Sequence, residues 1–171
     1  MDRRLIIIGV FLVGLVVAVI VATGGGDDSG EAFDPDSISK PEVEVPDGPP
    51  PKELEIDDIT EGEGTEAQAG DTLTMQYVGV NYSNGEEFDT SWDKPEPFSF
   101  QLGAGSVIPG WDQGIVGMKV GGRRQLIIPP ELGYGAQGQP PDIPPDETLI
   151  FVVDLLDAQA ATEAAAPAPA P

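Results

Sequence analysis

The side chains that usually carry out enzymatic chemistry are reduced in this sequence to carboxylates, hydroxyls and aromatic rings. Histidine and cysteine are both absent from the 171 residues. This excludes thiolate nucleophiles, thiolate and imidazole metal sites, and Ser-His or Cys-His catalysis. The stretch SVIPGWDQGIVGMKVGGRRQLIIPPELGYG, residues 106–135, instead gathers glycines around Trp111 and Tyr134. Only chemistry that uses neither a thiol nor an imidazole remains open.

The aromatic side chains allow two interpretations when taken one at a time. Trp111 and Phe151 could be ordinary core residues, since an isolated aromatic side chain in a small domain usually packs in the core. Tyr134 stands in a glycine-flanked loop and is harder to explain as core, because its hydroxyl needs a partner or water. Asp89, directly after Phe88, could simply cap a turn. Packing and binding roles both stay open at this point.

The elements that must position these side chains lie within residues 52–157. In TLTMQYVGVNY, Leu73, Met75 and Tyr77 alternate with the residues between them, which predicts a half-buried strand. The Asn84-Gly85 pair predicts a tight turn after it. In all, strands are predicted at residues 53–59, 72–82, 98–102, 123–129 and 148–158.

One short helix is predicted to begin at Pro109, since proline suits the first helical position. Trp111, Ile115 and Met118 then share one face. Glycines at 117, 121 and 122 are expected to end the helix and turn the chain back. These elements predict an α+β domain in which a small antiparallel sheet wraps around one short helix.

The N-terminal residues 1–23 are predicted to form a transmembrane signal-anchor. Arg3 and Arg4 precede an uncharged apolar run from Leu5 to Ala22, and at about 1.5 Å per residue this run nearly spans a bilayer core of about 30 Å. The arginines favour the inner face, which would place the rest of a single-pass protein outside the cytoplasm. A cleaved signal peptide, giving a secreted protein, is the alternative, and a buried helix is a third. No cysteine follows, so a lipoprotein anchor is excluded.

Both flanks of the folded region are predicted to be disordered. Residues 24–51 are rich in glycine, proline and acid, which is typical of a self-repelling linker. Residues 158–171 form an Ala/Pro tail. The formal net charge of −22 would repel phosphate backbones, so we expect no nucleic-acid partner.

Residues 52–157 resemble the FKBP-type peptidyl-prolyl cis-trans isomerase family, through several motifs in matching order and spacing. The motifs are YVG, FDTS, F-x-F-x-LG, VIPGWDQGI-x-GM-x-VG, IPPELGYG and IPP-x-x-TL-x-F-x-V-x-L. The resemblance implies an FKBP-like fold with one apolar pocket. It assigns Asp89, Tyr77 and Tyr134 to catalysis. It assigns substrate binding to Phe88, Phe98, Val107, Ile108, Trp111 and Phe151.

Three residues depart from the family pattern. Lys94 stands where an arginine usually supports the aspartate, and lysine cannot make the same bidentate contact. Gln139 replaces a common histidine, and Asp142 replaces an aliphatic residue at the pocket rim. These changes bear on the support of Asp89, on substrate preference and on macrolide affinity.

The resemblance implies an enzyme that rotates X–Pro peptide bonds. Together with the predicted N-terminal anchor, this leads us to expect a monomer that assists the folding of extracytoplasmic proteins. Such a reaction needs no metal and no cofactor, so the lack of histidine and cysteine is no obstacle. The implied partners are proline-containing polypeptides and macrolides such as rapamycin, and the predicted N-terminal helix adds the membrane. A binding module that only grips proline segments and a holdase chaperone are the alternative functions.

Overall fold

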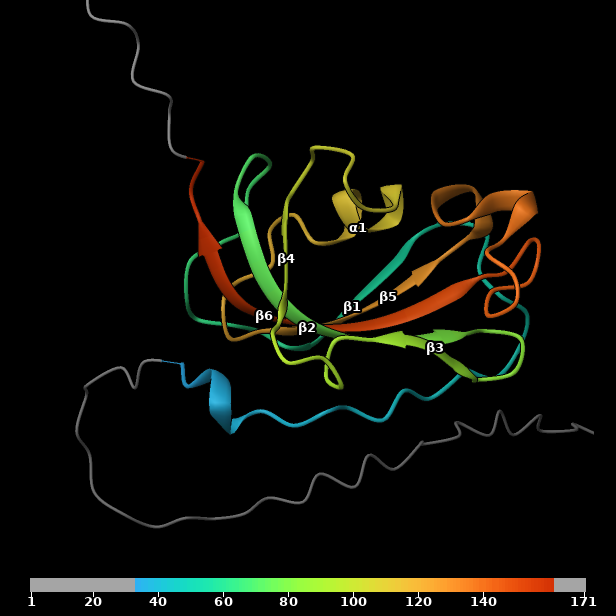
Figure 1. The fold of residues 1–171 in the computed structure, drawn as a ribbon, viewed down its shortest axis with the longest axis horizontal. Helices are drawn as coiled ribbons and strands as arrows, with labels where there is room; N and C mark the ends of the chain where they lie inside the picture. Colours follow the sequence, from blue (N-terminus) through green and yellow to red (C-terminus); the bar gives the residue numbers. More distant parts are fainter. Residues whose placement is uncertain (1–32, 162–171) are drawn as a thin grey trace, which may run out of the picture. The chain divides into compact units, whose positions relative to one another are not determined.

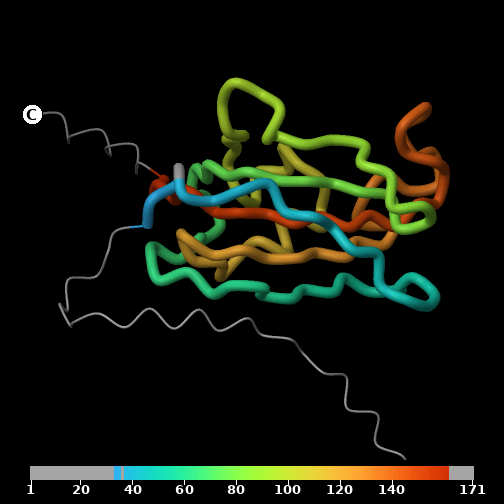
Figure 2. Tube along the Cα trace, turned by 90° about the horizontal axis from the view of Figure 1, so that it is seen from below, coloured from blue at the N-terminus to red at the C-terminus, as the bar shows by residue number. Residues whose placement is uncertain are grey.

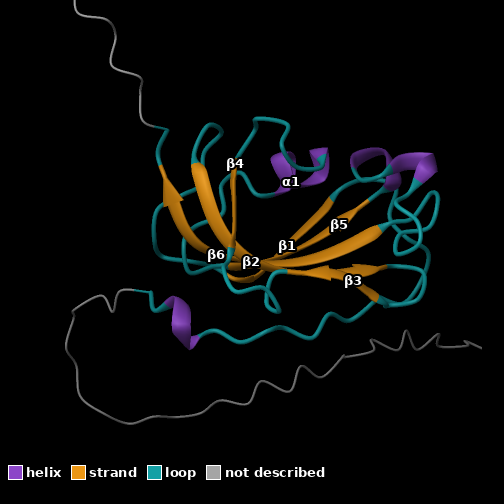
Figure 3. Ribbon diagram, in the orientation of Figure 1, coloured by secondary structure: helices purple, strands orange, loops and turns teal. Residues whose placement is uncertain are grey.

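The computed structural model describes residues 33–161, and within them six strands form one antiparallel sheet (Figures 1 and 3). The strand order is β1-β5-β6-β2-β3, and β4 also pairs with β2. One α-helix and three short 3-10 helices complete the described chain. The strands are β1 (Glu55–Thr60), β2 (Thr72–Asn81), β3 (Glu87–Thr90), β4 (Phe98–Gln101), β5 (Arg123–Ile128) and β6 (Leu149–Gln159). The helices are η1 (Pro35–Ser37), α1 (Pro109–Gly114), η2 (Pro130–Leu132) and η3 (Gly135–Gln137).

The two long strands β2 and β6 form the middle of the sheet, and their alternation creates its main core. Leu73, Met75 and Tyr77 point to the same face as Phe151 and Val153, and all five are buried in one cluster. The helix α1 lies against this face (Figure 1). This arrangement confirms the predicted α+β architecture of a sheet curved around one short helix.

Helix α1 begins at Pro109, as predicted, but it ends at Gly114 after six residues. Ile115 is already the C-terminal cap, and Met118 lies beyond the helix. Both side chains are nevertheless buried beside Trp111 in the main core. Gly117 comes too late to end the helix, and its φ of 80° serves the following turn instead.

A second apolar cluster lies on the other face of the sheet, where it is covered by the segment that we call the N-terminal strap, residues 33–51. Val43 and Val45 pack against a cluster that includes Val78 and Ile150. Figure 2, seen from below, shows the strap running across the strands. Every second residue from Pro41 to Val45 is partly buried, while the residues between them are exposed.

Polar contacts fix the strap along its length. The Arg123 guanidinium donates to the Ser39 carbonyl at 2.8 Å, and the Tyr82 hydroxyl donates to the Pro46 carbonyl at 3.3 Å. The Lys40 ammonium lies 3.0 Å from a Glu87 carboxylate oxygen. The disorder predicted for residues 24–51 is therefore wrong for residues 33–51, because the alternating valines have an apolar sheet face to cover.

Other predicted segments differ from the structure at their boundaries or lie outside the residues that it describes. The tail was predicted to start at residue 158, but β6 continues to Gln159 and Ala158 is buried. The predicted membrane segment 1–23, the linker residues 24–32 and the tail residues 162–171 lie outside the described residues. Within residues 33–161, no helix has the length and apolar character needed to cross a membrane.

Candidate active site

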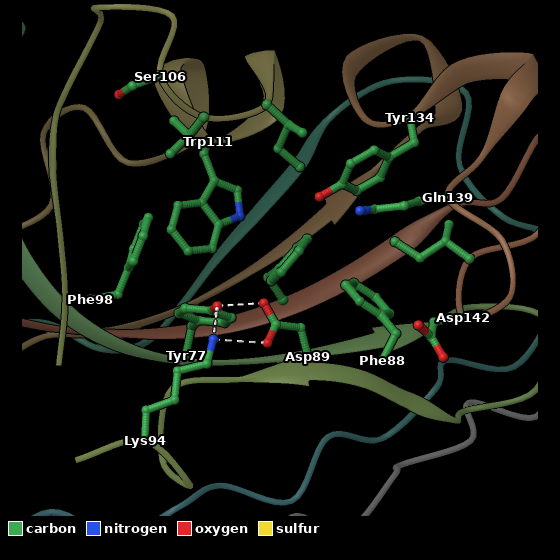
Figure 4. A pocket seen from close by; sticks show the side chains of 14 residues that line it. Tyr77, Phe88, Asp89, Lys94, Phe98, Ser106, Trp111, Tyr134, Gln139 and Asp142 are labelled. Carbon is green, nitrogen blue, oxygen red and sulfur yellow. Dashed lines mark hydrogen bonds and ion pairs between the residues drawn. The ribbon is translucent and has the colours of Figure 1, made fainter. Parts of the chain in front are cut away.

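A cavity of about 440 Å³ opens between the concave sheet face and the segment that contains α1 (Figure 4). Its walls come from β2, β3, β4, β6, the loop between β3 and β4, the α1 segment and the loops on either side of η3. The lining residues are Tyr77, Phe88, Asp89, Lys94, Phe98, Ser106, Val107, Ile108, Trp111, Tyr134, Gln139, Asp142, Ile143 and Phe151.

Trp111 forms the floor of the cavity, because its backbone lies in the first turn of α1 and its ring is packed among other rings. The indole is 4% exposed. Its centroid lies 5.2 Å from the ring of Tyr77 and 5.2 Å from that of Phe151, both in edge-to-face geometry. Phe98 adds a third edge contact at 6.0 Å. Such pairs fix ring orientations beyond what area burial alone would do, so the floor is rigid.

Gly79 on β2 permits the aromatic wall to form. A Cβ atom at this position would come within 2.7 Å of both the Phe88 and the Phe151 rings. The two rings meet edge to face with centroids 5.4 Å apart. The missing side chain of Gly79 therefore lets both rings lie directly on the sheet, where they line the cavity.

A polar cluster of Tyr77, Asp89 and Lys94 closes one side of the cavity (Figure 4). The Tyr77 hydroxyl donates to Asp89 at 2.5 Å. The Lys94 ammonium donates to the Tyr77 oxygen at 3.1 Å and to the second Asp89 oxygen at 3.0 Å. The lysine thus supports both partners with single contacts, in place of the bidentate contact that an arginine would make.

The protonation states within the site follow from burial and from this cluster. Burial raises the pKa of the Tyr77 hydroxyl above its ordinary value, and the hydrogen bond to Asp89 raises it further. Hydrogen bonds to Tyr77 and then to Asp89 raise the pKa of the Lys94 ammonium. Burial raises the pKa of Tyr134, and the charge of Asp89 adds to the effect. At neutral pH both tyrosines are therefore hydrogen-bond donors.

Two side-chain donors face the cavity, and one backbone donor belongs to a lining residue; none has an acceptor among residues 33–161. The Trp111 indole N–H is buried and unpaired, and Figure 4 shows it pointing into the cavity. The Tyr134 hydroxyl points toward the same space and has no partner in the described part of the chain. The Ile108 backbone accepts bonds from Trp111 and Asp112 through its carbonyl, but its own N–H donates to no described group. The site therefore offers donors to a bound molecule that carries carbonyl groups.

The loop before α1 is held by Asp112, whose carboxylate accepts from the backbone N–H groups of Gly103 and Gly105 at 2.8 Å and 3.1 Å. This contact fixes the turn that leads to Val107 and Ile108. The donors at that edge of the cavity are thus placed before any ligand arrives.

All the residues assigned to the site from the sequence line this single cavity. Ser106 and Ile143 also line it and were not assigned. Ile143 stands in the quoted IPP motif, and Ser106 directly precedes Val107, so both signals were present in the sequence. The unpaired N–H of Trp111 was not predicted, because a pattern of apolar residues in the sequence does not indicate the direction in which a side-chain ring points. Within residues 33–161 no group of three or more acidic side chains is placed to hold a metal ion.

Comparison with known proteins agrees with this geometry. The sequence profile of the FKBP-type peptidyl-prolyl cis-trans isomerases matches residues 63–156. The chain belongs to this family. An FK506-binding protein of Streptomyces anulatus is 61% identical over 121 residues, which are 70% of this chain and 98% of that protein.

Two further comparisons extend the FKBP-type match. A probable FK506-binding protein of Corynebacterium glutamicum is 49% identical over 121 residues, covering 71% of this chain and all of that protein. The crystal structure of AtFKBP13 superimposes with a TM-score of 0.58 at 38% identity, covering 65% of this chain and 96% of that one. The fold therefore agrees with the FKBP-type family that the sequence profile assigns.

Proposed function

We propose that the cavity catalyses cis–trans isomerisation of X–Pro peptide bonds in polypeptide substrates. One observation carries the proposal: packed aromatic rings line the same cavity as donors that have no acceptor within residues 33–161. Membership of the FKBP-type isomerase family supports the same reaction. The names of the relatives support FK506-type macrolides as a second class of ligand.

The reaction requires rotation about a bond with partial double-bond character. The two isomers of an X–Pro bond differ by only about 0.5–1 kcal/mol, while the barrier is about 18–20 kcal/mol. No bond is broken, so the protein has only to favour the twisted amide over the planar one. The twisted amide is less polar, so an apolar cavity that excludes water destabilises the planar ground state more.

The cavity residues have separate roles in this scheme. Trp111, Phe98 and Phe151 hold the proline ring, since they form the packed floor. The Ile108 N–H and the Tyr134 hydroxyl bind substrate carbonyls beside the reacting bond.

On the opposite side of the cavity, Asp89 acts electrostatically on the carbonyl that turns. It also orients Tyr77 through the hydrogen bond of 2.5 Å.

The test is isomerisation of a short Xaa-Pro-Phe peptide by the full chain, with and without rapamycin. We expect acceleration that rapamycin abolishes, and a loss of about tenfold or more, equivalent to about 1.4 kcal/mol of transition-state stabilisation, for Trp111→Leu and for Asp89→Ala. If both variants kept the full rate, the assignment of roles would be wrong. A chain that binds the peptide without accelerating isomerisation would instead be a binding module.

We also propose that the enzyme works as a monomer outside the cytoplasm, anchored by residues 1–23, and assists protein folding there. The paired arginines and the apolar run that follows them support this placement. Protease treatment of intact cells should digest the domain. N-terminal sequencing of the mature chain distinguishes an anchored protein from one released by cleavage after the apolar run.

A further inference from the structure

Asp142 stands at the rim of the cavity with a carboxylate that no described residue neutralises. Figure 4 shows its side chain next to Phe88. The residue is exposed, and its carboxylate has no hydrogen bond or ion pair within residues 33–161. It lies on the opposite side of Phe88 from the Tyr77–Lys94 cluster.

The backbone around Asp142 is fixed, so this charge is presented at a defined place. Asn81 is 2% exposed and donates from its side-chain amide to the Asp142 carbonyl at 2.8 Å. Gln139 and Ile143 exchange backbone hydrogen bonds of 2.9 Å and 3.0 Å across the turn that contains Asp142. The turn is therefore tied both to β2 and to itself.

The remaining charges of the cavity do not compensate Asp142. Its other charged lining residues are Asp89 and Lys94, which pair with each other at 3.0 Å. Beyond the cavity, each of the other cations in ion pairs contacts an acidic side chain on the sheet. They are Lys40, Arg123 and Arg124. The lysines without such a pair in the described residues, Lys52 and Lys119, do not line the cavity. The rim thus carries an excess of negative charge.

We propose that Asp142 makes the enzyme prefer proline segments that carry a lysine or arginine next to the proline. The proposal rests on the isomerase function proposed above. A substrate whose proline fills the cavity brings its neighbouring side chains to the rim. An ammonium or guanidinium group there is attracted to the unpaired carboxylate, whereas a carboxylate is repelled. For an exposed pair we expect a preference of about twofold to fivefold.

The experiment compares peptides that differ only in the residue before or after the proline. Lysine, glutamine and glutamate are placed at each position in turn, and isomerisation by the full chain is followed by exchange NMR, which needs no coupling protease. Glutamine is the neutral reference. We expect kcat/KM in the order lysine, glutamine, glutamate at one or both positions. Raising the salt from about 0.1 M to about 1 M should remove most of the difference, because the screening length falls from about 10 Å to about 3 Å.

Variants assign the effect to the rim. Asp142→Asn should bring the lysine-to-glutamate ratio of kcat/KM close to one, and Asp142→Lys should invert it. Asp57→Asn is the matched control, because it changes the net charge equally at an exposed position on β1 that does not line the cavity. The control should keep the wild-type ratio.

The outcomes separate this proposal from the function on which it rests. If the wild-type chain does not accelerate isomerisation of the glutamine peptides, the proposed function fails. If it does, but Asp142→Asn leaves the lysine-to-glutamate ratio unchanged at both positions, the preference does not come from Asp142 and the proposal is overturned. If Asp57→Asn changes the ratio as much as Asp142→Asn, net charge alone is the cause, which also overturns it.

Discussion

The Tyr77 hydroxyl donates a hydrogen bond of 2.5 Å to Asp89, so the aromatic floor and the charged edge of the cavity are directly joined. Tyr77 packs against Trp111 on one side, while Asp89 is partly open to solvent on the other. A substitution at either residue should therefore affect both the aromatic floor and the charged edge of the cavity.

Removal of the Lys94 cation should moderately weaken the contact between Tyr77 and Asp89. Lys94→Met deletes two hydrogen bonds, but the side chain is 49% exposed, so we expect kcat/KM to fall by about fivefold or less. Lys94→Arg keeps the charge and should stay within about twofold of wild type. Peptide isomerisation measures both, with Lys119→Met as a control outside the cavity. A loss in Lys94→Met no greater than in the control would show that the cation does not support Asp89.

Addition of a single methyl group at Gly79 should disturb the cavity wall. Gly79→Ala places a carbon 2.7 Å from both Phe88 and Phe151, so the rings must move. Overpacking of this kind typically costs about 1–3 kcal/mol. We expect lower unfolding free energy in urea and lower isomerase activity.

The double variant Gly79→Ala/Phe88→Leu tests the cause. A smaller side chain at residue 88 should restore part of the stability lost in Gly79→Ala. Equal stability of the single variant and wild type would contradict the predicted clash.

Polar substitutions in the strap should destabilise the whole domain. Val43→Ser or Val45→Ser removes a partly buried apolar side chain from the second cluster, and we expect a loss of about 1 kcal/mol of unfolding free energy for each. Glu44→Ser, at the exposed position between the two valines, is the matched control. Thermal or urea unfolding of the full chain gives the comparison. Valine variants as stable as the Glu44 control would mean that the strap contributes no stability.

The buried carboxylate of Asp154 should give the protein a distinctive pH dependence. Its side chain is 4% exposed, and burial raises its pKa even though Arg123 contacts it at 2.6 Å. Between the ordinary aspartate pKa of about 3.9 and the raised value, the folded chain holds a proton that the unfolded chain has lost. This group's contribution to unfolding free energy therefore decreases as pH rises through that window.

Asp154→Asn should remove that contribution to the slope. Urea unfolding at a series of pH values measures it, with Asp157→Asn at an exposed position of the same strand as the control. If the slope is the same in Asp154→Asn and wild type, the proton is held elsewhere.

The sequence predicted the strands well where burial of one face of the sheet produces a regular alternation of apolar residues. The alternation of Leu73, Met75 and Tyr77 located β2, and Pro109 located the start of α1. Burial on the second face was missed, because Val78 and Ile150 are covered by the strap, and no local period reveals a partner so distant in the chain. Strand β3 was also missed, since its four residues are too few to show an alternation.

The membership of the cavity was predicted from the motifs, and its detailed contacts were not. Residues as far apart as Tyr77 and Phe151 could be assigned to one pocket only through the family resemblance. The Trp111 N–H points into the cavity, and the Lys94 ammonium donates to both Tyr77 and Asp89. Both features depend on rotamers and tertiary packing, which the spacing of residues in the sequence does not encode. The alternation of Pro41, Val43 and Val45 was a readable signal for the strap, hidden by the proline and acid around it.

The strap also determines on which face of the sheet another molecule can be attached to the domain through Phe33. It leads into the fold across the sheet face opposite to the one that carries the cavity (Figure 2). A bead, a fluorophore or a fusion partner joined directly to Phe33 would therefore be attached through the strap and not through a residue that lines the cavity. Immobilised enzyme should accordingly retain its turnover on long, unfolded chains as well as on short peptides.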